Sequence, residues 1–274
     1  MSRFGAYGLR LAGVAGVEEA LVPAAEDWPL VRLSVRIRTD DAGLERFENR
    51  RAHLRLRTGG YVDIDRDQGT AVFTVPSPLS PEALVHPYLA PVAAVTAHWY
   101  GRESFHAGGI AIGGVAWAIV GDRHSGKSST LAALAQRDVD VVSDDVLVVE
   151  ELQPFAGPRT VDLRADAAAV LGVGDGLGRV GARDRWRMRL APLDRPLTLG
   201  GWVFTSWAEE TALVPVPGSE TLARLLQHRG LTVPPEQPAA FLPLSALPAW
   251  ELRRPRSWDA LPGALDRLIE TLSG

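Results

Sequence analysis

The first hundred residues alternate between apolar and polar positions over several short stretches. The alternation is clearest over 31–38 and recurs with an offset over 52–57; after a glycine pair, two further runs follow at 61–65 and 71–75. Alternation of this kind predicts half-buried strands. Short turns between such strands are typical of an antiparallel sheet with one face toward solvent. We therefore predict a smaller β-rich N-terminal domain over residues 1–100.

Beyond this region the pattern changes to continuous apolar runs. A helix is predicted over 82–100, although Pro87 and Pro91 should break or kink it. The runs 109–114 and 115–120 are short and apolar, which predicts buried strands.

A second set of elements follows these strands. The pattern predicts a helix over 128–137 and then a strand over 139–142, which 146–149 continues. Strand, loop, helix and strand form a βαβ unit with a nucleotide site at its strand ends. Further on, 199–206 predicts a strand and 260–272 a closing amphipathic helix. We assign residues 101–274 to an α/β nucleotide-binding domain.

The segment between the strand at 115–120 and its helix matches the phosphate-loop pattern G-x-x-x-x-G-K-[ST]. Its glycines let backbone N–H groups turn toward phosphates, and the helix N-terminus adds a partial positive charge. Lys127 would reach the β- and γ-phosphates, and the hydroxyl of Ser128 would ligate Mg²⁺. The predicted nucleotide-binding residues are Gly121, Asp122, Arg123, His124, Ser125, Gly126, Lys127, Ser128 and Ser129.

The use of lysine supports this assignment. Of the 29 basic side chains, 28 are arginine, and Lys127 is the single lysine. A compact ammonium charge is therefore present at the one position where a phosphate loop needs it. Asp144 and Asp145 end the next predicted strand, where a second acidic motif belongs in a P-loop protein. One carboxylate there would hold Mg²⁺ through water while the other accepts a proton.

Composition narrows the function classes. The formal net charge is −4 and the chain has no cysteine. We therefore expect no nucleic-acid partner and exclude a disulfide framework, a thiolate metal site and a cysteine nucleophile. No apolar stretch approaches the roughly 20 residues that span a bilayer, and no signal peptide is predicted. We expect a cytoplasmic protein without a membrane partner; self-association into a homo-oligomer stays open.

These motifs together resemble the catalytic core of bacterial HPr kinase/phosphorylase. In that family a histidine stands 15 residues before the first P-loop glycine, as His106 does, and an Asp-Asp pair begins 17 residues after the lysine, as Asp144 does. Further along, the family has an acidic residue two positions before an arginine. Asp162 and Arg164 occupy these two positions here. The stretch from 105 to 164 carries the resemblance. It implies an α/β fold: a P-loop kinase core with a mixed sheet, preceded by the β-rich N-terminal domain.

The resemblance also implies roles for individual residues. Lys127 and Ser128 would bind ATP and Mg²⁺, His106 would lie near the phosphates, and one of Asp144 and Asp145 would be the general base. The implied metal ligands are Ser128, Asp145 and Asp162. Arg164 is a candidate for stabilising charge on the moving phosphoryl group, as are three clustered arginines, Arg183, Arg185 and Arg187.

A second resemblance concerns the acceptor. The strand-rich first hundred residues, the start at Tyr7-Gly8-Leu9 and the cluster at 183–187 are similar to the HPr-kinase-related peptide serine kinases of ribosomal peptide pathways, such as lasso peptide clusters. The glycine-rich stretch of HPr kinase is replaced by 165–167, and its late phosphorylase-associated segment has no counterpart. We therefore expect transfer in the forward direction only, with His106 tuning phosphate binding.

The leading hypothesis is an ATP- and Mg²⁺-dependent kinase that phosphorylates a serine of a peptide or small protein. A nucleotide-binding regulatory ATPase module and a small-molecule kinase are the alternatives. Transfer of label from ATP to an acceptor, or its absence, separates these three.

Overall fold

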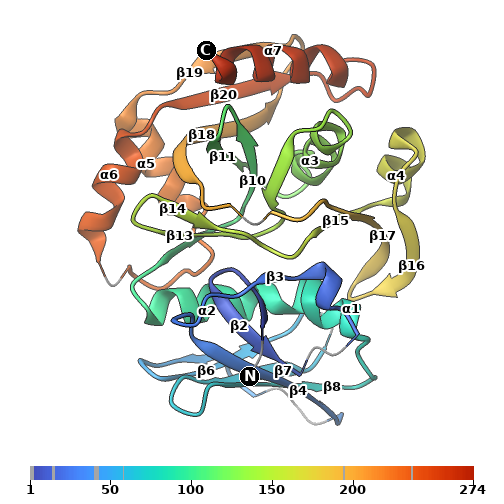
Figure 1. Ribbon diagram of the computed structural model, residues 1–274, viewed down its shortest axis with the longest axis vertical. Helices are drawn as coiled ribbons and strands as arrows, with labels where there is room; N and C mark the ends of the chain where they lie inside the picture. Colours follow the sequence, from blue (N-terminus) through green and yellow to red (C-terminus); the bar gives the residue numbers. More distant parts are fainter. Residues whose placement is uncertain (1–2, 14–15, 40–42, 58, 194, 236) are drawn as a thin grey trace.

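The alternating stretches of the first hundred residues form one eight-stranded sheet (Figure 1). The structure is a computed structural model that describes residues 3–13, 16–39, 43–57, 59–193, 195–235 and 237–274. The strand order is β3-β1-β2-β4-β8-β7-β6-β5. The strands are β1 (Phe4–Ala6), β2 (Leu9–Ala12), β3 (Val22–Pro23), β4 (Leu30–Ile37), β5 (Arg46–Phe47), β6 (Arg51–Arg55), β7 (Tyr61–Asp65) and β8 (Thr70–Val75), with a short 3-10 helix η1 (Glu18–Ala20) before β3.

This sheet is mixed, so the prediction of an antiparallel sheet was wrong for two of its seven strand pairings. β6, β7 and β8 form an antiparallel meander, but β4 runs parallel to β8 and to β2. The reason is that β5 to β7 intervene before the chain returns beside β4. Alternation reports which face of a strand is buried and carries no information about the direction of its neighbour.

The predicted helix over 82–100 is interrupted as expected. It consists of α1 (Pro81–Ala83), a distorted segment η2 (Leu84–Tyr88) and α2 (Leu89–Trp99). The break is at His86, which has φ −152° and ψ 122°, because a residue before proline is pushed toward extended conformations. Ser80 caps α1 by accepting a hydrogen bond from the N–H of Ala83 at 3.2 Å. The apolar residues of α2 are buried against the N-terminal sheet.

A six-stranded sheet forms the centre of the remaining chain, in the order β12-β10-β11-β18-β20-β19. Its strands are β10 (Ala107–Ile112), β11 (Val115–Val120), β12 (Asp140–Ser143), β18 (Thr198–Trp207), β19 (Ala212–Pro215) and β20 (Ala249–Arg254). β11, β18 and β20 are mutually parallel, whereas β10 is antiparallel to both β11 and β12. The predicted mixed sheet is therefore present, and the predicted strands at 115–120 and 199–206 are confirmed.

Helices cover both faces of this sheet (Figure 1). Ile119, Val203 and Leu252 pack with α3 (Lys127–Ala135) and α7 (Leu261–Ser273). The adjacent residues Val120 and Phe204 face the other way, toward α5 (Gly218–Gln227) and α6 (Phe241–Ala246). Successive side chains of a strand point to opposite faces, so continuous apolar runs are what a sheet covered on both sides requires.

Two small sheets join this core to the N-terminal sheet. One has the order β14-β13-β9, and the other β15-β17-β16. The elements are β9 (Glu103–Phe105), β13 (Leu147–Glu150), β14 (Gln153–Phe155), β15 (Thr160–Leu163), α4 (Ala165–Leu171), β16 (Asp175–Val180) and β17 (Arg183–Arg189); a 3-10 helix, η3 (Pro238–Ala240), precedes α6.

The prediction that 146–149 continues the strand at 139–142 was wrong. Asp145 adopts φ +70°, which turns the chain, and β13 pairs with β9 and β14 instead of entering the sheet of β12. Val146 and Val148 pack in the core of the N-terminal sheet.

The fold is thus α/β with mixed sheets, preceded by a β-rich N-terminal region. Because the core of that region also takes in residues of β13, β14 and β16, a domain boundary at residue 100 stays a prediction. No helix in the described part of the chain is long and apolar enough to cross a membrane.

Candidate nucleotide-binding site

The phosphate loop follows β11 at the edge where the parallel strands β18 and β20 also end. Gly126, at φ +86°, precedes α3 in the left-handed conformation that glycine adopts without penalty. At Gly121 a Cβ would lie 2.4 Å from the Oγ1 of Thr205, so this position also requires glycine. The loop therefore lies tightly against β18 and leads directly into the N-terminus of α3, a position suited to an anion.

Lys127 is buried, and its ammonium group lies against its own loop. Nζ donates to the carbonyl oxygens of Gly121 at 2.6 Å and Asp122 at 3.0 Å, and it lies 3.3 Å from the Nε2 of His106. Burial lowers the pKa of Lys127, against the opposing effect of nearby aspartates. No carboxylate of the described residues lies within 4.0 Å of this ammonium, so its charge is not neutralised by direct contact.

Ser128 and Asp144 lie side by side. The Ser128 hydroxyl donates to Oδ1 of Asp144 at 3.0 Å, and the N–H of Asp145 donates to the same oxygen at 2.9 Å. Asp144 is almost completely buried, and this burial raises its pKa. The sequence assigned a metal contact to Asp145, but the structure places Asp144 next to the hydroxyl that would ligate Mg²⁺.

Asp145 and His106 lie near Lys127 and Asp144 in the same site. The side chain of Asp145 is 38% exposed, and His106 Nδ1 lies 3.1 Å from its carbonyl oxygen and 3.5 Å from its carboxylate. Burial, and next the charge of Lys127, lower the pKa of His106. His106 therefore lies between the lysine and the exposed carboxylate, close to the phosphate loop.

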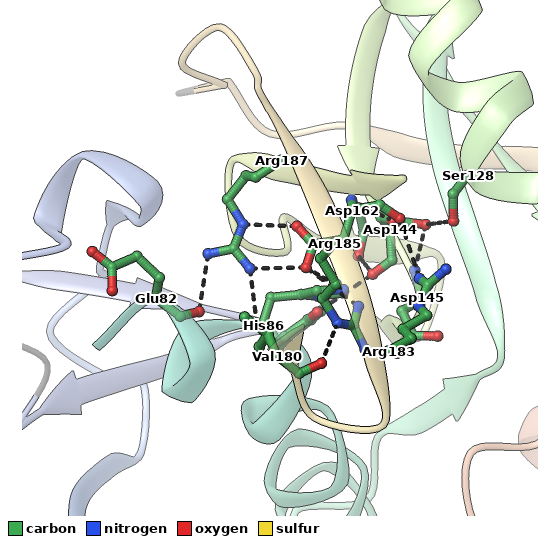
Figure 2. Close-up of polar contacts among 12 residues, drawn as sticks. Glu82, His86, Ser128, Asp144, Asp145, Asp162, Val180, Arg183, Arg185 and Arg187 are labelled. Carbon is green, nitrogen blue, oxygen red and sulfur yellow. Dashed lines mark hydrogen bonds and ion pairs between the residues drawn. The ribbon is translucent and has the colours of Figure 1, made fainter. Parts of the chain in front are cut away.

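Asp162 has a different environment, shown in Figure 2. Its two carboxylate oxygens accept from Arg187 at 2.7 and 2.9 Å, and Arg185 adds a contact at 3.3 Å. Arg187 also donates to the backbone carbonyls of Glu82 and His86. Metal ligation by Asp162 stays a prediction, but its lone pairs are already used by two arginines. Both arginines were candidates for phosphate contact, and the structure occupies them with this carboxylate.

The remaining predicted arginines line the cavity. Arg164 is exposed at the residue before α4. Arg183 donates to the carbonyl oxygen of Asp162 at 3.3 Å; burial, followed by the charges of Arg185 and Arg164, lowers its pKa.

A cavity of about 820 Å³ connects these groups. All predicted site residues except Gly121, Ser125 and Arg187 line it. It extends from the phosphate loop to the end of β6 and the start of α2 in the N-terminal region. Nine basic side chains face it, against five aspartates, whereas the whole chain has a net charge of −4. The basic residues are Arg55, Arg57, Arg123, Lys127, Arg164, Arg183, Arg185, Arg254 and Arg256. Such a local excess of positive charge suits a polyanionic ligand.

The donor set also fits Mg²⁺. Among the described residues no three His, Asp or Glu side chains form a group that would hold a metal by themselves. Nucleotide enzymes bind Mg²⁺ through one or two carboxylates together with substrate phosphates. Ser128 and Asp144 supply that limited set.

Two further residues at this edge were not among the predicted site residues. Trp207 ends β18 and Arg254 ends β20, and both line the cavity beside the loop. The signal for them is strand order: both strands are parallel to β11, so their carboxyl ends meet the loop.

Comparisons with known proteins give matches among solved structures and none among family models or curated proteins. Among solved structures the chain is similar to the Hpr(Ser) kinase/phosphatase from Coxiella burnetii, with 13% identity and a TM-score of 0.32, over 62% of this chain and 95% of that one. The functional conclusion therefore depends on the residues of the site.

Proposed function

We propose that the protein is an ATP- and Mg²⁺-dependent kinase that transfers the γ-phosphoryl group of ATP to a serine hydroxyl of a peptide or small protein. One observation carries the proposal. The phosphate-loop lysine, the Ser128–Asp144 pair and the half-exposed carboxylate of Asp145 line a single positively charged cavity.

The residues divide the reaction between them. Lys127 and the N-terminus of α3 attract the triphosphate, which positions its γ-phosphorus. Ser128 and Asp144 would hold Mg²⁺, which neutralises charge on the β- and γ-oxygens when bound. Asp145 accepts the proton of the acceptor hydroxyl while the hydroxyl oxygen bonds to the γ-phosphorus. The bond between the γ-phosphorus and the β–γ bridging oxygen breaks, and this oxygen leaves with ADP. Asp162 holds Arg185 and Arg187 in place beside this group.

The acceptor belongs on the side of the cavity away from the loop. Arg55 and Arg57 lie there, as do Tyr88 and Pro91. A volume of about 820 Å³ is in the upper part of the range for ligand sites, which supports simultaneous binding of a nucleotide and an acceptor segment. The resemblance to peptide serine kinases leads us to propose a ribosomal peptide as that acceptor, phosphorylated in the forward direction.

The test is transfer from labelled ATP to serine-containing peptides and small proteins, followed by mass spectrometry. Lys127→Ala is expected to lower transfer by at least about 10²-fold, the effect of removing one preorganised charge contact, while the protein stays folded. Arg137→Ala is the control, because Arg137 pairs with Asp266 at the far end of α3. A folded Lys127→Ala protein with normal transfer contradicts the proposal. Phosphate release to water alone indicates the ATPase, and label on small molecules alone indicates a small-molecule kinase.

A further inference from the structure

Arg254 and Trp207 pack directly on the phosphate loop. The guanidinium carbon of Arg254 lies 4.4 Å from the centre of the Trp207 ring, and the Trp207 indole N–H donates to the carbonyl oxygen of His124 at 3.2 Å. A Cβ at Gly126 would lie 2.5 Å from the Nη2 of Arg254 and 3.1 Å from the Trp207 ring. The guanidinium group is therefore adjacent to the loop residue that opens α3.

The charge of Arg254 has no carboxylate partner. The residue is 5% exposed, and within the described part of the chain no Asp or Glu lies within 4.0 Å of it. Among the described residues, its guanidinium group makes one hydrogen bond, a long one to the carbonyl oxygen of Pro255 at 3.4 Å. Burial lowers the pKa of Arg254 to about 10. Arg187 is buried to a similar degree, at 6% exposed, but it has Asp162 as a bidentate partner.

A buried charge without a partner is unfavourable. The positive end of α3 and the ammonium of Lys127 lie in the same region and add to this effect. An anion arriving at the loop would relieve all three. The ring of Trp207 covers one face of the guanidinium group. The edge of the group can still donate hydrogen bonds, and its planar fork of N–H donors matches a phosphate group.

We propose that Arg254, held by Trp207, is a phosphate-binding residue that donates to the nucleotide's phosphate chain at the loop. This inference rests on the proposed function. It makes Arg254 a second fixed positive charge at the phosphate site, besides Lys127. It assigns the phosphate contact to the end of β20, whereas the sequence pointed to arginines on β17 and before α4.

The test compares Arg254→Met with Arg253→Met in the full chain. Arg253 is the adjacent residue of the same strand, 47% exposed and paired with Glu251, so it is the matched control. Binding of ATP, ADP and adenosine is measured by calorimetry. We expect Arg254→Met to weaken ATP and ADP about 10- to 100-fold, as for a lost hydrogen-bonded charge contact, with adenosine unchanged. Arg254→Lys should give an intermediate loss, because it keeps the charge without the fork. Arg253→Met should bind like the wild type.

A second measurement separates binding from packing. Without nucleotide, Arg254→Met should melt no lower than the wild type, because an unpaired buried charge has been removed. With saturating ADP its gain in melting temperature should be smaller than that of the wild type. A loss of nucleotide-free stability with unchanged affinity would show that Arg254 is structural and overturn the proposal.

Further results would support or overturn the assignment of Arg254 to the phosphate chain. Equal weakening of adenosine and ADP would place Arg254 at the base and overturn the phosphate assignment, as would wild-type affinity of Arg254→Met for ATP. Pyrophosphate serves as a probe without a nucleoside. If the wild type binds pyrophosphate through Arg254 but does not bind ATP, the proposed kinase fails while the anion site stands. If it binds neither, both are overturned.

Discussion

Two buried aspartates lie next to each other in this protein and have opposite electrostatic properties. The backbone N–H of Asp162 donates to Oδ2 of Asp144 at 3.4 Å, and both side chains are almost fully buried. Burial raises the pKa of Asp144; His86 opposes this rise, and the charge of Asp145 adds to it. Burial also acts to raise the pKa of Asp162, but His86, Arg187 and Arg185 outweigh it and hold that pKa below its usual value.

The two pKa values move in opposite directions because the partners of each carboxylate differ, although both carboxylates are almost fully buried. Asp162 is neutralised by a bidentate arginine that also donates to the carbonyls of Glu82 and His86, so it joins β15 and β17 to the N-terminal region (Figure 2). Asp144 has a hydroxyl and backbone N–H groups as direct partners and, among the described residues, no arginine within 4.0 Å. No arginine of the described residues therefore has to be displaced before a cation binds Asp144.

The sharpest way to test this division is to change the exposed carboxylate beside Asp144. Asp145→Asn should lower phosphoryl transfer by roughly 10²- to 10⁴-fold, the usual effect of losing a general base, while ATP still binds. Asp144→Asn should instead raise the Mg²⁺ concentration needed for activity. Both are measured as initial rates across a Mg²⁺ titration, with Asp166→Asn, an exposed cavity residue on α4, as control. Normal transfer by Asp145→Asn would remove the base from our mechanism.

Breaking the arginine side of the comparison should affect stability. Arg187→Met leaves Asp162 buried with a weaker partner and removes two donors to backbone carbonyls, so we expect a loss of about 3 kcal/mol in the free energy of unfolding. Arg189→Met changes an exposed residue of the same strand that pairs with Glu19, and it should leave the free energy of unfolding almost unchanged. Urea unfolding measures both. Equal losses in the two variants would mean that the Asp162 cluster does not stabilise the fold.

The smallest expected effect is in the pH dependence, where the two aspartates should have opposite signs. Because the folded pKa of Asp144 is raised above the ordinary 3.8, the folded state holds a proton that the unfolded chain releases, and stability falls as pH rises through that window. Asp144→Asn should therefore gain stability relative to the wild type as pH rises from 3.8.

The folded pKa of Asp162 is lowered, so its contribution is present above 3.8 and is lost only as pH falls below that value. The difference between the wild type and Asp162→Asn should therefore be constant above 3.8. Unfolding free energies between about pH 4 and pH 7 test the slope expected for Asp144→Asn and the constant difference expected for Asp162→Asn. The same slope for the two variants would contradict the comparison.

The phosphate loop, the strand before it, the helix after it and the acidic pair that follows could all be predicted from the sequence. These features are local, because the glycines, the lysine and the apolar run that define them lie within a few residues of each other in the sequence. The alternating strands of the first hundred residues were determined in the same way, because alternation follows directly from having one buried face.

The partner of each charged side chain could not be predicted from the sequence and follows from the fold. Asp162 meets Arg187, 25 positions along the chain, Arg254 reaches Gly126 from the end of another strand, and Asp144, not Asp145, faces Ser128. The fold also decided that β4 and β8 run parallel and that Val146 turns away from β12. The physical reason is that strand order and direction bring distant residues together, and the properties of a buried charge depend on those neighbours and not on the residues beside it in the chain.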